Sequence, residues 1–242
     1  MKLYVSIDDT DNKESFGTGR MARMLCDGLR EQHLIGHATI TRHQFLIHPD
    51  IPYTSHNSSA CIEADGEAGD SGSIFAFSAA FLASHFHAGS NPGLCVGQER
   101  RIPPELVEFG LRAQREVITI DEARRLSDRL GIALWWQGET GQGIIGAMGG
   151  MGLRSTGNDG RFIGLAGIRE ITGIVRVDEI LQRTPVERIV AGDGETLRGE
   201  EMVDTLDWIR PVLRDGAIVL VVLKEEGVWR TIEKAKRKKK TS

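Results

Sequence analysis

Strand-like and helix-like patterns alternate through the first two thirds of the chain, and this alternation limits the fold more than any other feature of the sequence. Residues 2–7 alternate and then turn polar, which is typical of a strand, whereas residues 18–33 repeat apolar side chains every three or four positions, which is typical of a helix. Further strands are predicted at 38–47, 58–65, 132–136, 162–168, 172–176, 186–191 and 217–223, and helices at 72–87 and 142–153, from Pro103-Pro104 onward and after the capping-box spacing Thr119–Glu122. The sequence therefore predicts an α/β or α+β fold in which mixed sheets pack against helices.

Length and composition set the expected domain organisation. A chain of 242 residues suits one unit of ~200–250 residues or two smaller ones, and its 40% of hydrophobic residues allow a sizeable core. The last third is richer in predicted strands, which indicates a soft boundary near 165–175. We therefore expect a main region at 1–170, a smaller strand-rich region at 171–233 and a basic tail at 234–242.

Several protein classes are excluded by what the sequence lacks. No stretch approaches ~18 uninterrupted apolar residues, as a membrane span needs. The first residues contain too few apolar side chains for a signal peptide. Cys26, Cys61 and Cys95 are scattered and form no CxxC pair, which argues against a disulfide framework and against a zinc site. These observations favour a cytoplasmic protein without a membrane partner.

Charge is unevenly distributed along the chain. The formal net charge is −4, but six of the 30 basic residues lie between 234 and 240. The remainder has 24 basic against 34 acidic residues, and an acidic body argues against a general nucleic-acid surface. The tail is either a solvated, mobile end or a contact for RNA.

An acidic turn follows the first predicted strand directly, in the order Ile7-Asp8-Asp9-Thr10-Asp11-Asn12. Three carboxylates within four residues repel one another, and a hard cation such as Mg²⁺ would remove that repulsion. Carboxylates at strand ends are also where α/β proteins tend to hold metal and phosphate. The competing interpretation is an Asp-rich turn that caps the next element. On the first interpretation Asp8, Asp9 and Asp11 are metal ligands.

A glycine turn comes next, Gly17-Thr18-Gly19-Arg20, at the start of the predicted helix. Glycines let a ligand approach the backbone, a helix N-terminus presents unpaired N–H groups, and Arg20 adds donors suited to phosphate oxygens. The alternative is a simple loop-to-helix turn with Thr18 as the N-cap. The acidic turn and the glycine turn together would place a metal site beside a phosphate site, as a nucleoside triphosphate needs. The Walker A pattern GxxxxGK[ST] is absent.

Two later segments offer further candidate contacts. The polar loop His48–Asn57 ends in Asn57, which is either a ligand contact or an ordinary turn residue. A second glycine-rich loop, Gly138–Gly143, leads into the helix predicted at 142–153. There Gly143 and Gly146 would either approach phosphate or a nucleoside, or let the helix pack closely against a strand.

Taken in order, these motifs resemble the archaeal agmatidine synthetases, which modify the wobble cytidine of an isoleucine tRNA. Ile7–Asn12 resembles their IDDTDS, and Gly17–Arg20 stands where they have a CTTY-like turn. Pro49–Ala60 is similar to their NPNIPWKTRGNGA segment, Asn91–Gly93 to their NPG turn, and Gly143–Ala147 to their GLIGA segment. The shared order covers roughly residues 1–170.

The resemblance implies a kinase-like domain that binds ATP and Mg²⁺, joined to a ferredoxin-like domain. It also implies that Asp8, Asp9 and Asp11 serve the metal, and that Thr18 corresponds to a threonine that can be phosphorylated. With the glycine turn this gives Asp9, Thr18 and Arg20 as catalytic candidates. The remaining predicted nucleotide contacts are Gly17, Gly19, Asn57, Gly143 and Gly146.

The chain also departs from the family pattern. CTTY is replaced by GTGR, and the basic pair of KTRGNG is lost at Thr54–Ser59. The full-length synthetases continue into an OB-fold and a zinc ribbon, whereas this chain has no clustered cysteines. We therefore expect a short, stand-alone relative that handles ATP and Mg²⁺ and has another acceptor, either a small molecule or an RNA.

Three hypotheses about function follow from the sequence. The first is a Mg²⁺-dependent, ATP-using phosphotransferase or ligase-like enzyme. The second is a non-catalytic, RNA-associated module, suggested by the basic tail and by the family's link to tRNA. The third is a phosphatase with Asp9 as its nucleophile, because Asp9-Thr10-Asp11 after a strand is similar to the DxD of haloacid-dehalogenase-type enzymes.

Overall fold

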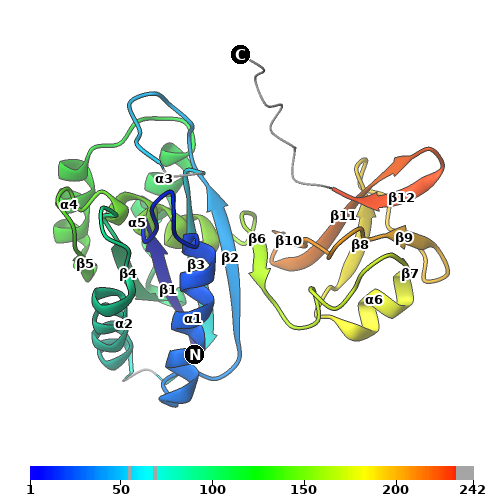
Figure 1. Ribbon diagram of the computed structural model, residues 1–242, viewed down its shortest axis with the longest axis horizontal. Coiled ribbons are helices and arrows are strands. Elements are labelled where there is room, and N and C mark those ends of the chain that lie inside the picture. The colour runs from blue at the N-terminus through cyan, green and yellow to red at the C-terminus, as the bar shows by residue number, and fades with distance from the viewer. Residues whose placement is uncertain (54–55, 68–69, 233–242) are drawn as a thin grey trace. The chain divides into compact units, whose positions relative to one another are not determined.

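The computed structural model describes residues 1–53, 56–67 and 70–232 of the chain (Figure 1). The predicted tail at 234–242, together with Thr54 and Ser55 of the polar loop, lies outside these residues. The chain divides into two compact units, Met1–Gly164 and Leu165–Ser242. No described helix is long and apolar enough to cross a membrane.

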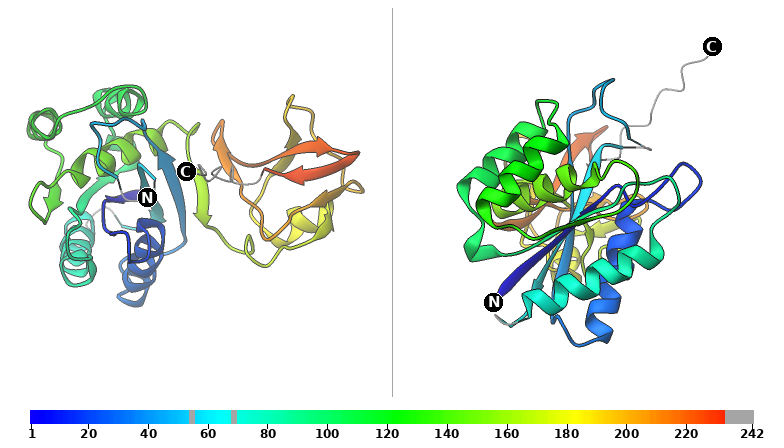
Figure 2. Two further views of the ribbon diagram at one scale, coloured as in Figure 1. Left: turned by 45° about the horizontal axis from the view of Figure 1, so that its top comes forward. Right: turned by 90° about the vertical axis from the view of Figure 1, so that its left-hand side faces the viewer.

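Unit 1 is built on a sheet with the strand order β5–β4–β1–β3–β2–β6, in which every neighbouring pair is antiparallel. Its elements are β1 (Lys2–Asp8), α1 (Thr18–Glu31), β2 (Ala38–Gln44), β3 (Ser58–Asp65), α2 (Ser71–His85), β4 (Gly93–Gln98), the 3₁₀ turn η1 (Glu99–Arg101), α3 (Pro104–Ala113), α4 (Ile120–Leu130), β5 (Leu134–Trp136), α5 (Gly143–Ser155) and β6 (Arg161–Gly164). Helices cover both faces of this sheet, α1 and α2 on one and α3, α4 and α5 on the other (Figure 2, left). Unit 1 therefore has three layers.

The central strand β1 is buried on both faces. Leu3, Val5 and Ile7 enter the core beneath α1 and α2, whereas Tyr4 enters the core beneath α3, α4 and α5. Helix α1 completes the first core with an apolar stripe that includes Leu25. Apolar burial on both faces of one strand fixes the middle layer of the unit.

Unit 2 is a smaller, strand-rich unit with the elements β7 (Ile174–Arg176), α6 (Val177–Arg183), β8 (Arg188–Ala191), β9 (Met202–Asp204), β10 (Val212–Arg214), β11 (Ala217–Glu225) and β12 (Val228–Thr231). The long strand β11 pairs antiparallel with β10 and β12, and parallel with β8. Strand β12 pairs parallel with β9, which in turn pairs antiparallel with β7. The core of unit 2 lies between these strands and α6.

The predicted fold class is confirmed, since mixed sheets pack against helices throughout the described chain. The predicted helix at 18–33 ends at Glu31, and the strand predicted at 162–168 ends at Gly164. The prediction missed β4, helix α6 and the short strands β9, β10 and β12. Three- and four-residue strands carry too few positions for a periodic signal, so pairing with neighbours decides them.

Two local predictions about helix starts have different outcomes. Thr119 caps α4, because its hydroxyl accepts the backbone N–H of Glu122 at 3.2 Å. Thr18 is not the N-cap of α1. Gly17 holds that position with extended backbone angles, and Thr18 is the first helical residue.

Candidate functional site

One end of the unit 1 sheet gathers the polar motifs of the sequence. Strand β1 ends there at Asp8, directly opposite Gly93, the first residue of β4. Helices α1 and α5 both begin at this end, and the loop between β1 and α1 carries the acidic turn (Figure 1). The strand ends and helix starts that the sequence separates by more than 130 residues therefore form one site.

Asp8 is packed between the acidic turn and α5. Its Oδ1 accepts the backbone N–H of Asp9 at 2.8 Å, and its carboxylate lies against Gly146, where any Cβ would overlap it. Removal from water raises the pKa of Asp8 to about 8, and the negative charge of Asp9 adds to that rise. A carboxyl group in these surroundings gains from a nearby positive charge.

Asp9 is held in an unusual backbone conformation. Its φ of 50° lies in the left-handed region, where non-glycine residues are uncommon, although Asp tolerates it better than most. Its Oδ2 accepts the side-chain amide of Gln142 at 3.0 Å. Burial raises the pKa of Asp9, while hydrogen bonds from Gln142 and Asn91 oppose that rise. Strained residues of this kind cluster at functional sites.

Asp11 closes the acidic turn onto helix α1. Its Oδ1 accepts both the backbone N–H of Thr18 at 3.1 Å and the Thr18 hydroxyl at 2.7 Å. The Thr18 Oγ1 in turn accepts the hydroxyl of Thr10 at 3.2 Å, so the Thr18 side chain is buried in this network. A carboxylate at the first turn also complements the helix dipole. The side chain that caps the start of α1 is therefore the carboxylate of Asp11, and not the hydroxyl of Thr18.

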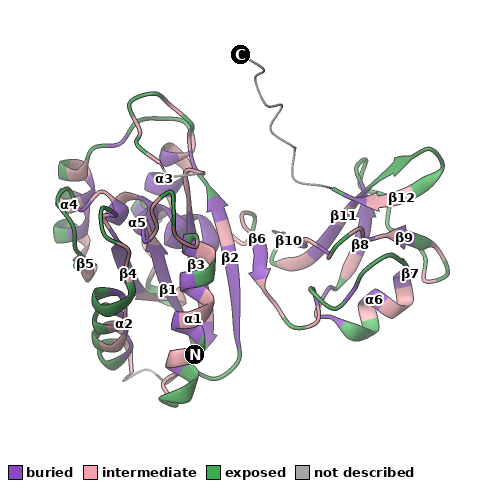
Figure 3. Cartoon of the chain, viewed as in Figure 1, coloured by how far each residue is buried: buried purple, intermediate pink, exposed green. Residues whose placement is uncertain are grey.

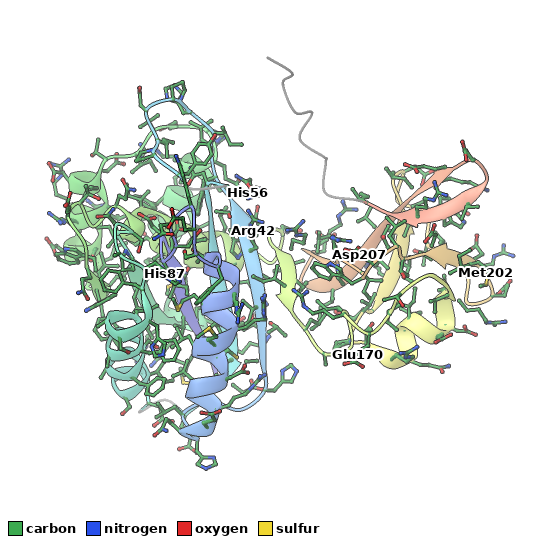
Figure 4. All side chains as sticks on the ribbon, in the orientation of Figure 1. Arg42, His56, His87, Glu170, Met202 and Asp207 are labelled. Carbon is green, nitrogen blue, oxygen red and sulfur yellow. The ribbon has the colours of Figure 1, made fainter. Side chains whose placement is uncertain are left out.

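The predicted residues of the glycine turn lie together at the start of α1. The guanidinium of Arg20 lies 4.9 Å from the ring centroid of Phe16, whose ring meets His87 edge-on at 4.7 Å. Figure 4 shows His87 on the same side of unit 1 as the acidic turn. Gly19 has its Cα directed at β6, where an added Cβ would come within 3.0 Å of Ile163 Cδ1.

The second glycine motif makes close backbone contacts at the start of α5. The Gly143 N–H donates to the Asn91 carbonyl at 3.0 Å, and an added Cβ at Gly143 would lie 2.5 Å from Gly93 N. Gly146 meets Asp8 in the same way. Both glycines thus have a packing role that brings α5 against β1 and β4, and their contact with a cofactor stays a prediction.

Asn57 directly precedes β3, whose Ala60 lies opposite Ile7 of β1, so it lies at the same end of the sheet, but its hydrogen bonds go to the loop that follows β2. Its side-chain amide donates to the Leu46 carbonyl at 2.6 Å, and its own carbonyl accepts the backbone N–H of Phe45 at 2.9 Å. These bonds close the base of the polar loop that follows β2. A contact between Asn57 and a nucleotide also stays a prediction.

The described residues contain no group of three or more His, Cys, Asp or Glu side chains arranged to hold a metal ion by themselves. Each carboxylate of the acidic turn accepts at least one hydrogen bond, Asp8 from the Asp9 N–H, Asp9 from Gln142 and Asp11 from Thr18. Mg²⁺ in nucleotide sites is commonly held by one or two carboxylates plus phosphates and water. The donor set of the turn suits that arrangement better than a protein-only metal cage.

Sequence reasoning missed four residues of this end of the sheet: Arg42, Asn91, Gln142 and Arg161. Asn91 was expected to be part of a turn, and Gln142 stood inside the second glycine motif without a role. The hydrogen bond between Gln142 and Asp9 joins residues 133 positions apart, so no local pattern signals it. Arg42 and Arg161 become neighbours only through the pairing of β2 with β6.

Comparisons with known proteins agree with the motif resemblance. No protein-family model matches the chain. The sequence is 28% identical over 156 residues to TiaS of Pyrococcus horikoshii, a 2-agmatinylcytidine synthetase of an isoleucine tRNA, and the match covers 63% of this chain and 36% of that protein. The resemblance to agmatidine synthetases is thereby confirmed, and the chain spans just over a third of the length of this relative.

Solved structures show the same relationship in the fold. A tRNA fluorescent labeling enzyme is similar with a TM-score of 0.53 at 25% identity, over 63% of this chain and 36% of that chain. A complex of TiaS with its isoleucine tRNA and ATP is similar with a TM-score of 0.53 at 23% identity, again over 63% and 36% of the two chains.

Proposed function

We propose that unit 1 binds ATP together with Mg²⁺ at the acidic turn, and that the chain is a Mg²⁺-dependent phosphotransferase or ligase-like enzyme related to the tRNA agmatidine synthetases. The observation that carries the proposal is the closure of the turn onto α1, through the hydrogen bonds from Thr18 to Asp11. A carboxylate turn beside a helix N-terminus offers adjacent places for a metal ion and for phosphates. The curated relative, by its name, is a synthetase that acts on an isoleucine tRNA, and a solved relative of similar fold holds ATP.

The residues of the turn fit a metal–nucleotide complex. The charges of Asp9 and Asp11 raise the pKa of Asp8 beyond the effect of burial, and the charge of Arg42 opposes them only in part, so the carboxylates of the turn repel one another. Mg²⁺, when bound with the nucleotide, would neutralise this charge and that of the phosphates. Asp8, Asp9 and Asp11 are the residues that would hold it.

The start of α1 is proposed to orient the phosphates. Gly17 has no side chain to block the helix N-terminus, where the helix dipole favours an anion. The Thr18 N–H at this terminus already donates to the Asp11 carboxylate, and the Arg20 N–H donates to the Gly17 carbonyl. Arg20, in the first turn of α1, adds a forked donor for phosphate oxygens. These groups would stabilise negative charge that develops on a transferring phosphoryl group.

Thr18 and Asp11 are proposed as a functional pair. The Thr18 hydroxyl donates to the Asp11 carboxylate at 2.7 Å, so Asp11 is placed to accept the proton of that hydroxyl. The family resemblance implies that this threonine can be phosphorylated. In the described arrangement the hydroxyl is buried, so phosphorylation at this position requires the turn to open.

The test is incubation of the full chain with ATP labelled on the γ-phosphate, in Mg²⁺ and in EDTA, with separate measurement of free products and protein-bound label. We expect Mg²⁺-dependent turnover that falls at least a hundredfold in Asp9→Asn. Asp27→Asn is the matched control, because Asp27 lies on the exposed side of α1, away from the turn. Label retained by the wild type and lost in Thr18→Ala would identify Thr18 as a phosphate carrier.

The same assay separates the competing functions. Phosphomonoester hydrolysis without ATP, trapped by beryllium fluoride at Asp9, would replace the proposal with the phosphatase. Turnover that rises on addition of RNA would make RNA the acceptor, whereas turnover that depends on a small amine or alcohol would make it a small molecule. An ATP-using enzyme would find its nucleotide in the cytoplasm, the compartment that the sequence predicts. ATP turnover unchanged in Asp9→Asn would contradict the assignment of the site.

A further inference from the structure

Two arginines lie side by side at the functional end of unit 1. Arg42, near the end of β2, is the direct cross-strand partner of Arg161, the first residue of β6. Figure 4 shows Arg42 on β2, and both side chains are half-buried. Like charges that face each other across neighbouring strands destabilise a sheet. An anion between them would turn this repulsion into attraction.

The arginine pair belongs to the same site as the acidic turn. The first turn of α1 crosses β6 at Ile163, two residues beyond Arg161, where an added Cβ at Gly19 would lie 3.0 Å from Ile163 Cδ1. Burial and the charge of Arg161 lower the pKa of Arg42, whereas the charges of Asp8 and Asp11 oppose that decrease. Arg42 therefore lies within electrostatic reach of the carboxylates of the turn.

The Arg42 side chain is also oriented by the sheet. Its Nε donates to the Ser58 hydroxyl at 2.8 Å, which fixes the plane of the guanidinium by one edge. A planar fork of donors held in one orientation suits the tetrahedral oxygens of phosphate better than a lysine ammonium would.

We propose that Arg42 and Arg161 form a phosphate clamp, which holds phosphate oxygens of the nucleotide on the β2–β6 side of the acidic turn while the carboxylates hold its metal. This proposal rests on the proposed function and adds the residues that bind the polyphosphate. It places negative ligand charge between two cations that otherwise repel each other.

The test measures binding of two probes, ATP with Mg²⁺ and inorganic tripolyphosphate, to the full chain. We expect Arg42→Ala and Arg161→Ala each to weaken the binding of both probes at least tenfold. Arg42→Lys should recover little of the lost affinity. Arg101→Ala is the matched control, since Arg101 is exposed in η1. A thermal melt of each clamp variant checks that it is folded, because Arg42→Ala also removes the hydrogen bond to Ser58.

The outcomes distinguish the clamp from the function on which it rests. Binding of both probes within twofold of wild type in the alanine variants, with ATP turnover still abolished in Asp9→Asn, overturns the clamp alone. A different result separates them the other way: if the wild type shows no ATP turnover, but the alanine variants lose tripolyphosphate binding, the clamp is supported and the proposed function is overturned. A wild type that binds neither probe overturns both.

A second inference comes from the outer face of the unit 2 sheet. Large apolar side chains stand in solvent there: Ile174 is 64% exposed, Met202 44%, Leu223 42% and Val228 36%. Their strand neighbours Val175, Val203 and Val222 point the other way, into the core of unit 2. The face therefore carries an apolar surface that the described part of unit 2 does not cover.

The strand register arranges this face in two rows. The first row reads Leu223, Arg230, Asp204, Ile174 across β11, β12, β9 and β7. The second row reads Glu225, Val228, Met202, Arg176 across the same strands, with the parallel register of β12 and β9 continued by one residue. In each row, each side of the centre has one charged and one apolar side chain.

Each row is complementary to the same row of a second copy when the strand order of that copy is reversed. A two-fold axis parallel to the strands and midway between β12 and β9 places Leu223 opposite the second copy's Ile174, and Arg230 opposite its Asp204. The same axis places Glu225 opposite Arg176 and Val228 opposite Met202. Opposite charges and apolar pairs meet at every position, as an isologous interface requires. Within one copy Arg230 also contacts Asp204 and Glu225, at 3.3 Å each, and Arg176 contacts Asp178 at 2.7 Å, so the charge pairs across the axis extend ion pairs that each copy already has.

We infer that a second copy of this chain packs on this face, with the two sheets facing each other through their outer rows. Met202, labelled in Figure 4, is the first residue of β9 and lies opposite Arg176 in the second row. The test is sedimentation velocity of the full chain over a concentration series. We expect a dimer whose dissociation constant rises at least tenfold in Glu225→Arg and in Arg176→Glu, and returns toward the wild-type value when the two reversals are combined.

Asp193→Arg is the control for a change of net charge, because Asp193 is exposed in the loop between β8 and β9. A wild type that stays monomeric at all concentrations overturns the inference, including the case in which another part of the chain covers the face. Association that survives both single reversals also overturns it, since the dimer then uses another surface.

Discussion

The two units of the chain complete their sheets in different ways. Unit 1 covers both faces of its sheet with helices, and its strands are buried along most of their length (Figure 3). Unit 2 buries one face of its sheet against α6 and leaves the apolar side chains of the other face exposed. In unit 1, only the ends of the strands and helices remain for chemistry, whereas in unit 2 a whole face remains for association.

The largest expected effect tests whether the units are independent. Leu25 in α1 and Leu220 in β11 each have at most 1% of their surface exposed. Leu25→Ala should lower the stability of unit 1, and Leu220→Ala that of unit 2, each by about 2–5 kcal/mol, because each leaves a cavity in a separate core. Denaturant unfolding followed by fluorescence and circular dichroism should show each variant moving a different transition. Equal shifts of all signals in both variants would mean that the two units unfold as one.

The next effect sharpens the account of how unit 1 builds its functional end. Gly146→Ala should destabilise unit 1 by roughly 1–3 kcal/mol, because the new methyl group overlaps the Asp8 carboxylate. Gly72→Ala is the matched control, since an added Cβ there meets nothing within 4 Å and Ala favours a helix by about 0.5–1 kcal/mol. Thermal melts should therefore move in opposite directions for the two variants. If Gly146→Ala melts like Gly72→Ala, α5 does not pack against Asp8 as described.

A smaller effect concerns pH and again involves unit 1 alone. His43 is fully buried and bonds Asp159 Oδ1 at 2.7 Å. Burial lowers the pKa of His43 below 6.5 and the charge of Arg154 adds to this, although Asp159 opposes it. The unfolded chain therefore binds more protons below pH 6.5, so stability is complete above 6.5 and decreases as the pH falls.

The slope from this group is at most about 1.4 kcal/mol per pH unit. Urea unfolding of the wild type and of His43→Gln between pH 5 and 8 should show the difference, with a flatter profile in the variant below pH 6.5. Identical profiles would show that His43 does not titrate in this window on unfolding.

The smallest effect is a local one. Thr119→Ala should cost unit 1 about 1 kcal/mol, because it removes the side-chain acceptor for the Glu122 N–H at the start of α4. Thr119→Ser keeps the hydroxyl and serves as the control. A loss of the same size in both variants would indicate that the methyl group of Thr119, and not its hydrogen bond, stabilises the helix.

Much of unit 1 could be predicted from the sequence, because its signals are local. The apolar stripe of α1, the capping box at Thr119 and the glycine-rich start of α5 each depend on residues within one or two turns. The acidic turn and the glycine turn were also predicted to meet, since only five residues separate Asp11 from Gly17. The hydrogen bonds from Thr18 to Asp11 agree with that expectation.

Unit 2 was harder to predict for a physical reason. Strands β9 and β10 have three residues each, so neither carries a periodic pattern, and their conformation depends on pairing with β7, β11 and β12. The outer rows of that sheet exist only once the register is fixed, because a slip of one residue would turn each apolar side chain to the other face.

The sequence by itself determined the acidic turn, the start of α1 beside it and the apolar strand β1, because neighbours along the chain specify these features. Only the tertiary structure decided that Gly146 meets Asp8, that Gln142 bonds Asp9 and that Arg42 pairs with Arg161. These contacts join residues more than 100 positions apart. They form when two cores pack on opposite faces of one sheet and bring its strand ends together, a condition that no local pattern encodes.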